Sequence, residues 1–206
     1  MIEFQVVALL ALLPLSLGTL QLALLLVDNH HLDHAAFLAA RHGAVRHGNM
    51  DDMRRAYAQA LSTLYVVSDT PLDRSNVLGR VATAYAAATA DIAAHARVRL
   101  LSPQRDAQAD FARLRGGHRV IPNDALEFRS AAPGARSGIS LQQANVLRVE
   151  FTFCRPLVVP FARQLLVGTM RMLDHDPWHQ RCYAAGRIPV RSEGVAPMQS
   201  DFRVTS

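Results

Sequence analysis

Residues 3–27 read EFQVVALLALLPLSLGTLQLALLLV, and the part from Phe4 to Val27 contains no charged residue. At about 1.5 Å per residue, this apolar run measures about 36 Å as a helix. That length is enough to cross a hydrocarbon core of about 30 Å with some tilt. Its many leucines favour insertion more strongly than its few polar residues oppose it. The sequence therefore predicts a membrane-spanning helix with an acid, Glu3, at the mouth of the span.

A cleaved secretory signal peptide is the main alternative to a retained anchor. Such peptides carry a positive charge before a shorter apolar core, and small residues at the cleavage site. The first two residues provide no cation, and Val27-Asp28-Asn29-His30 is a poor cleavage site. We therefore interpret residues 1–27 as a retained transmembrane anchor. The nearest cations, Arg41 and Arg46, follow the span. Because positive residues favour the cytoplasmic side, this charge distribution taken alone argues against export of the domain.

Composition narrows the function classes for residues 28–206, which are enough for one domain with its own core. The chain has 50% apolar residues and a formal net charge of +5, which suits a protein held near anionic lipid headgroups. The densest basic stretch, Arg97 to Arg119, is interrupted by Asp106 and Asp110 and contains a single aromatic residue. Nucleic-acid binding needs clustered basic residues with interleaved aromatics, so we expect no nucleic-acid partner.

Helical periodicity continues beyond the apolar run. Leu32, Ala36, Ala39 and Gly43 recur along one face as a stripe of mainly small side chains. Small side chains allow another backbone to approach closely, so this stripe predicts a packing seam.

Capping residues predict where further helices begin. Gly48 suits the end of the first helix and Asn49 the N-cap of a second. Thr70-Pro71 suits the start of a third. Ser102-Pro103 predicts a short helix that stops at Gly116-Gly117.

Strand signals come late in the chain. Residues 147–154 alternate apolar and polar side chains, which is typical of a strand with one buried face. Pro122 and Pro189 predict that residues 118–121 and 187–191 form edge or short strands. The sequence therefore predicts an α+β fold: a long N-terminal transmembrane helix that continues into a periplasmic helical region, with a small late antiparallel sheet.

The N-terminal third resembles the TadE-like pilus-assembly family, which comprises minor pilin-like components of the Tad (Flp-type) pilus machinery. Glu3-Phe4 opens an apolar span that contains a proline, Pro14. The segment Ala39-Ala40-Arg41-His42-Gly43-Ala44 is similar to the family's Ala-Ala-Arg-Glu-Gly-Ala turn of helix. The late strand followed by residues 155–160 resembles the family more loosely. The resemblance covers about Met1 to Gly48.

The resemblance implies a function and a location. The chain would be a pilin-like assembly component in the bacterial inner membrane, with a single span and its C-terminal domain in the periplasm. Its partners would be other pilin-like subunits, platform proteins and membrane lipid. Glu3 and Phe4 would act in assembly, because in pilin-like assembly the glutamate pairs with the free terminal amine of a neighbouring subunit.

Three positions depart from the family pattern. His42 stands where the family usually has a glutamate, and Pro14 lies deeper in the span than the family's proline. Pilin-like proteins are cut after a glycine that follows a basic leader, which leaves the glutamate near the fifth mature position. Glu3 sits two places earlier, so we expect either a start upstream of Met1 or an unprocessed relative.

Cys154 and Cys182 are the only cysteines. Behind an export anchor, the oxidising periplasm favours a disulfide between them. We expect this bridge to tie two late β segments together. Closing a loop of this length stabilises a fold by about 3 to 4 kcal/mol in the chain-entropy model.

The histidines suggest a metal hypothesis that we set aside. His30 and His34 have helical i, i+4 spacing, but spacing fixes no third ligand and Arg41 lies on the same face. We interpret them as solvated side chains next to the membrane. Pro177 interrupts residues 175–182, so we interpret that segment as a turn and expect no metal site.

Enzyme motifs are lacking in this sequence: it has no nucleophile elbow, no P-loop and no dinucleotide-binding glycine pattern. We therefore expect no enzyme, no cofactor and no small-molecule substrate. The alternative function is a membrane-anchored periplasmic ligand-binding or sensor domain. A second span or a cytoplasmic output domain would favour that alternative.

Overall fold

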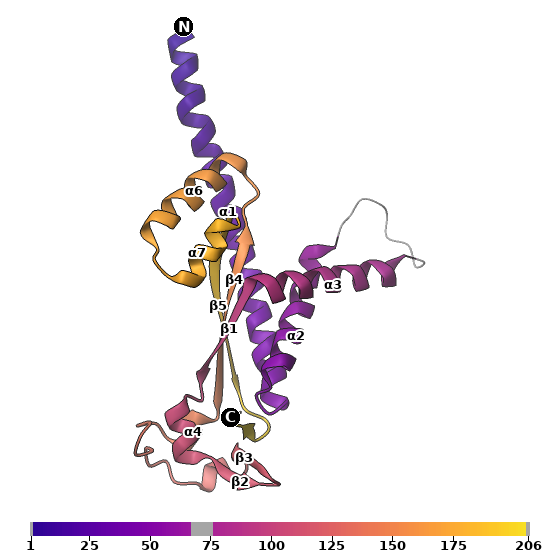
Figure 1. Cartoon of the computed structure of the whole chain (residues 1–206), viewed down its shortest axis with the longest axis vertical. Coiled ribbons are helices and arrows are strands. Elements are labelled where there is room, and N and C mark those ends of the chain that lie inside the picture. The colour runs from indigo at the N-terminus through magenta and orange to yellow at the C-terminus, as the bar shows by residue number, and fades with distance from the viewer. Residues whose placement is uncertain (1, 67–75, 205–206) are drawn as a thin grey trace. The chain divides into compact units, whose positions relative to one another are not determined.

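The computed structural model describes residues 2–66 and 76–204. It has a mixed α+β fold, as predicted, in which one long helix precedes shorter helices and two small sheets (Figure 1). The predicted start of a third helix at Thr70-Pro71 lies outside the described residues. The elements follow one another as α1 (Ile2–Val45), α2 (Met50–Leu61), η1 (Ser62–Tyr65), α3 (Val77–His95), β1 (Ala96–Ser102), α4 (Arg105–Phe111), β2 (Arg113–Arg115), β3 (His118–Ile121), η2 (Leu126–Phe128), α5 (Leu141–Ala144), β4 (Val146–Pro156), α6 (Pro160–Leu173), α7 (Pro177–Ala184), β5 (Arg187–Pro197) and β6 (Phe202–Arg203).

Helix α1 is 44 residues long and runs without interruption through the apolar run and the small-residue stripe. Pro14 lies inside it. The helix ends where His47 and Gly48 take positive φ angles of 59° and 72°, a conformation that glycine adopts at little cost. The Asn49 side chain then accepts hydrogen bonds from the backbone N–H groups of Asp51 and Asp52 at 2.9 and 3.1 Å. The predicted helix stop and N-cap are therefore confirmed.

The strands form two three-stranded sheets, in the orders β1-β4-β5 and β2-β3-β6. Strand β4 contains the alternating segment that predicted it. The prediction of edge or short strands next to Pro122 and Pro189 is confirmed, although the second strand is longer than predicted. The strand before Pro122, β3, is short but central in its sheet, with antiparallel neighbours β2 and β6. The strand that contains Pro189, β5, lies at an edge but extends to Pro197.

The predicted helix that stops at Gly116-Gly117 is wrong in its extent. Helix α4 ends at Phe111, and a hairpin of β2 and β3 follows. Gly116 and Gly117 have φ angles of +56° and +80°, so they form the tight turn that two consecutive positive φ angles allow. The glycines end a strand here, where the sequence suggested that they end a helix.

Residues 175–182, predicted to be a turn, instead contain the start of helix α7. Pro177 occupies the first turn of this helix, where its missing N–H costs nothing. The Asp176 carboxylate caps the helix by accepting from the backbone N–H groups of Trp178 and His179. Helix α6, before it, also begins with a proline, Pro160. The same residue type that argued against a helix therefore opens both helices.

The chain forms two compact units. The first comprises residues 1–31 and 152–191 and contains α6 and α7. The second comprises residues 32–151 and 192–206 and contains α2, α3 and the β2-β3-β6 sheet. Its core includes the stacked rings of Tyr57 and Phe151, whose centroids lie 4.0 Å apart.

Candidate functional site

The N-terminal part of α1 presents apolar side chains outward. From Ala11 to Leu20 every side chain is exposed or half-buried, including Leu12, Leu15 and Leu20. Among the described residues, α1 is the one helix long and apolar enough to cross a membrane. The predicted assembly residues Glu3 and Phe4 lie in the first turn of this helix. The structure thus contains a candidate membrane span where the sequence predicts one.

Ser16, Thr19 and Gln21 lie within the apolar run, and each makes a hydrogen bond. The hydroxyls of Ser16 and Thr19 donate to the backbone carbonyls of Leu13 and Ser16, both at 2.9 Å. Gln21 is buried, and its Oε1 accepts from the backbone N–H of Val159 at 2.9 Å. A polar group in hydrocarbon is costly only when it is unpaired, so these three residues are compatible with a span.

Two contacts join the late segment of the first unit, residues 152–191, to the C-terminal end of the apolar run. One is the bond between Gln21 and Val159. The other is an ion pair in which Arg155 Nη2 lies 2.8 Å from Asp28 Oδ1 and Arg155 Nε 3.1 Å from Asp28 Oδ2. Sequence reasoning missed both contacts, because each joins α1 to residues more than a hundred positions later and no local spacing rule connects them.

The small-residue stripe packs inside the second unit. Leu32, Ala36, Ala39 and Gly43 are all buried. A Cβ atom at Gly43 would lie 2.5 Å from Met53 Sδ and 3.0 Å from Leu147 Cδ2, so no larger side chain fits there without movement. This face of α1 therefore contacts α2 and β4 of the same chain.

The predicted disulfide between Cys154 and Cys182 is present, with the two Cα atoms 5.3 Å apart. The prediction that it ties two β segments together is wrong, because Cys182 lies in α7. The bridge links β4 to α7 within the first unit.

An acidic side chain missed by sequence reasoning organises the end of α6 and the start of α7. Asp174 accepts hydrogen bonds from the Asp176 backbone N–H at 3.0 Å, from the Tyr183 hydroxyl at 2.8 Å and from His179 Nδ1 at 2.7 Å. The bond from Asp176, then those from Tyr183 and His179, lower the pKa of Asp174 to about 2. Asp176 before Pro177 is an N-cap signature that would have located the start of α7 from sequence.

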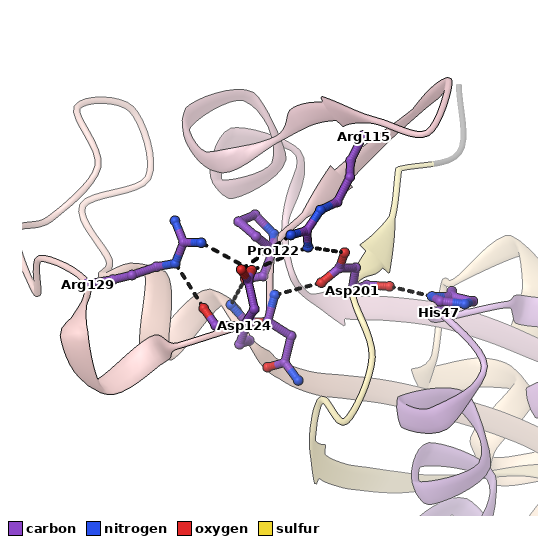
Figure 2. A network of polar contacts seen from close by, with 8 residues as sticks. His47, Arg115, Pro122, Asp124, Arg129 and Asp201 are labelled. Carbon is purple, nitrogen blue, oxygen red and sulfur yellow. Dashed lines mark hydrogen bonds and ion pairs between the residues drawn. The ribbon is translucent and has the colours of Figure 1, made fainter.

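A second polar network, in the other unit, surrounds Arg115 (Figure 2). Arg115 Nη1 lies 3.0 Å from Asp201 Oδ2, and its Nη2 lies 3.3 Å from Asp124 Oδ2. Arg129 also pairs with Asp124, at 3.1 Å, and His47 Nδ1 lies 2.9 Å from the backbone oxygen of Asp201.

In this network each arginine is paired with an aspartate, and the pairing shifts the pKa values of Arg115 and Asp124. The hydrogen bonds to Asp201 and Asp124 raise the pKa of Arg115. Burial alone would raise the pKa of Asp124, but its own backbone N–H and Arg115 lower it overall. The network joins the β2-β3 hairpin to the segment that carries Asp201, so we interpret it as structural.

Two observations on the described part of the chain concern ligand binding. His30 and His34 are exposed, and no group of three or more His, Cys, Asp or Glu side chains is arranged there to hold a metal ion. A hollow of about 480 Å³ lies between α2, α3 and β1, with Ala58, Ile92 and Val98 in its lining.

Comparisons with protein-family models, with curated proteins and with solved structures found no match.

Proposed function

We propose that this chain is a pilin-like structural component of a Tad-type pilus assembly. It is anchored in the bacterial inner membrane by a single span, with its C-terminal domain in the periplasm. It acts through protein contacts with other pilin-like subunits and with platform proteins of the inner membrane.

The observation that carries this proposal is the division of α1 into two parts. The part from Ala11 to Leu20 exposes its apolar side chains, whereas the part from Leu32 to Ala44 buries a face of small side chains against α2 and β4. An exposed apolar helix needs lipid or neighbouring helices around it. A subunit built this way has an anchor that is also available for helix packing with other subunits.

Glu3 is the residue that makes such packing selective. A carboxylate that enters hydrocarbon is costly unless a partner neutralises it, and burial of an unpaired charge is far more costly than burial of a paired one. Pairing with the terminal amine of a neighbouring subunit removes that cost. Assembly is then favoured only where a subunit supplies the amine.

The test compares Glu3→Gln and Glu3→Asp with the wild-type chain in cells that carry the other pilus components. Glu3→Gln keeps the span inserted, because removal of a charge makes insertion cheaper, but it reduces co-purification with the other subunits and surface piliation. Glu3→Asp keeps the charge with a shorter reach and has an intermediate effect. Glu127→Gln, the same change at an exposed position of the second unit, is the matched control.

Membrane levels of all variants are matched before comparison, so that a loss of subunit contacts is separated from a loss of protein. If Glu3→Gln matches the wild-type chain in both measurements, the proposed assembly role of Glu3 is wrong.

The hollow between α2, α3 and β1 is the observation that favours the second candidate, an anchored periplasmic ligand-binding or sensor domain. Its volume of about 480 Å³ lies in the range of small-molecule sites. A sensor domain would keep its activity in Glu3→Gln, because its site lies in the second unit. The Glu3 variants therefore discriminate between the two functions.

A further inference from the structure

Helix α6 carries large apolar side chains that the protein leaves exposed. Leu165 is 72% exposed, Met172 81% and Leu173 73%. Leu165 and Met172 are seven positions apart, so they lie on the same face of the helix. Such a face on a soluble surface is unfavourable, which indicates that something apolar covers it.

The start of α6 is fixed beside the apolar run of α1. The backbone N–H of Val159, which precedes the helix, donates to the buried Oε1 of Gln21. Gln21 lies within the candidate span, so α6 begins at the depth of that residue. Within this unit α6 extends to the side of α1 rather than along it (Figure 1).

The length of α1 that precedes its contact with Val159 indicates that the bilayer surface lies near the level of Gln21. Residues 4–20 precede the contact with Val159 and measure about 25 Å as a helix. A hydrocarbon core measures about 30 Å, so a bilayer that covers these residues also reaches the level of Gln21. Leu22, Leu26 and Val27 remain exposed on α1 beyond that level, so the apolar surface of the anchor continues past Gln21.

The positive charge of α6 favours a lipid surface, rather than another protein, as the partner that covers its apolar side chains. Arg163 and Arg171 are both exposed on α6, and the helix has no acidic residue. By helical spacing, Arg163 lies on the side of α6 opposite Leu165 and Met172, and Arg171 lies on its flank. A basic polar face opposite an apolar one is typical of helices that lie in the headgroup region of anionic membranes.

We propose that α6 is an interfacial helix that binds the surface of the bilayer spanned by α1. Its exposed apolar face enters the boundary between headgroups and acyl chains, and Arg163 and Arg171 contact anionic headgroups. The chain is therefore held to the membrane by two elements, a span and a surface helix. This inference rests on membrane anchoring by α1, and it does not depend on a role in a pilus.

The test places a fluorescent NBD probe on full-length protein reconstituted in vesicles of phosphatidylcholine and phosphatidylglycerol. The probe is attached at Leu165→Cys or Met172→Cys, and at Gln164→Cys as the matched control on the adjacent face. The natural cysteines are joined in the disulfide, so labelling is specific. Iodide quenches probes in water, and lipids with a nitroxide near the headgroup quench probes in the bilayer.

Probes at positions 165 and 172 should be protected from iodide by about threefold relative to position 164, as expected for a shallowly inserted face, and should be quenched by the nitroxide lipid. Equal iodide quenching at all three positions would overturn the proposal. Protection that disappears when the protein is diluted tenfold in lipid would also overturn it, because a second copy of the chain would then be the cover. Flotation of the wild-type chain with vesicles tests the anchor separately: protein that does not float shows that α1 itself fails to anchor.

Discussion

Asp28 and Arg155 form a two-point ion pair whose side chains are only 20% and 14% exposed. Asp28 is the first charged residue after the apolar run of α1, and Arg155 lies near the end of β4. Partial burial strengthens such a pair and makes the loss of one partner costly, since the other charge stays poorly solvated. The pair therefore stabilises the first unit where α1 leaves its apolar run.

Replacement of Arg155 by methionine tests this contribution. We expect Arg155→Met to lower the free energy of unfolding by about 1 to 3 kcal/mol, because it leaves the Asp28 carboxylate half-buried without its partner. Arg54→Met is the matched control. Its partner is Asp51, and both side chains of that pair are more than half exposed, so we expect a loss below about 0.5 kcal/mol. Thermal unfolding of the purified chain in detergent measures both, and equal losses would contradict the role of burial.

Gly194 allows β5 to approach α1 closely in the second unit. A Cβ atom at this position would collide with the backbone carbonyl of Ala36, and a backbone atom in a helix cannot move aside as a side chain can. We expect Gly194→Ala to destabilise the fold by about 1 to 3 kcal/mol. Gly79→Ala should have the opposite sign and stabilise by up to about 1 kcal/mol, since Gly79 lies in α3 with open space around it. Chemical denaturation of both variants measures the difference, and a neutral Gly194→Ala would refute the close contact.

Local patterns predicted the elements that depend on local rules. The apolar run, the stop at Gly48, the Asn49 cap and the alternation in β4 each have a short-range physical cause, and each is present. The stripe from Leu32 to Gly43 is buried along α1, as its small side chains suggested.

Errors arose where one residue type has two structural uses. Proline ends a helix when it lies inside it but starts one at the first position, and Pro177 takes the second role. Consecutive glycines end a helix or form a hairpin turn, and Gly116-Gly117 take the second role because β2 and β3 pair across them. The contacts of Gln21 and Asp28 depend on tertiary structure alone, so no sequence window contains them.

The disulfide should make the first unit sensitive to reductant. Intact protein should be lighter than its reduced form by the mass of two hydrogen atoms. Reduction should lower the free energy of unfolding by about 3 to 4 kcal/mol, because a bridge between Cys154 and Cys182 constrains the unfolded chain. The double variant Cys154→Ser with Cys182→Ser is the control, since reductant has no bond to break there. Two freely alkylated thiols in protein isolated without reductant would exclude the bridge.

Asp174 should make the first unit sensitive to acid. Its pKa is about 2 in the folded protein, against an ordinary value of 3.8. Because the folded-state pKa is depressed, the stability that its ionised form contributes is fully present above about pH 4 and is lost as the pH falls toward 2. Asp110 and Asp124 also have lowered pKa values, so acid weakens the second unit too, and only a comparison with variants isolates Asp174.

The comparison uses Asp174→Asn and Tyr183→Phe. Asp174→Asn removes the titrating group, so between pH 4 and 2 its unfolding midpoint should fall less steeply than that of the wild-type chain. Tyr183→Phe removes the hydroxyl that donates to Asp174, so the pKa of Asp174 should rise toward its ordinary value and the acid loss should become intermediate. Unfolding midpoints at several pH values in this window measure all three proteins. Parallel curves for the wild-type chain and Asp174→Asn would show that the hydrogen bonds around Asp174 do not stabilise its charge.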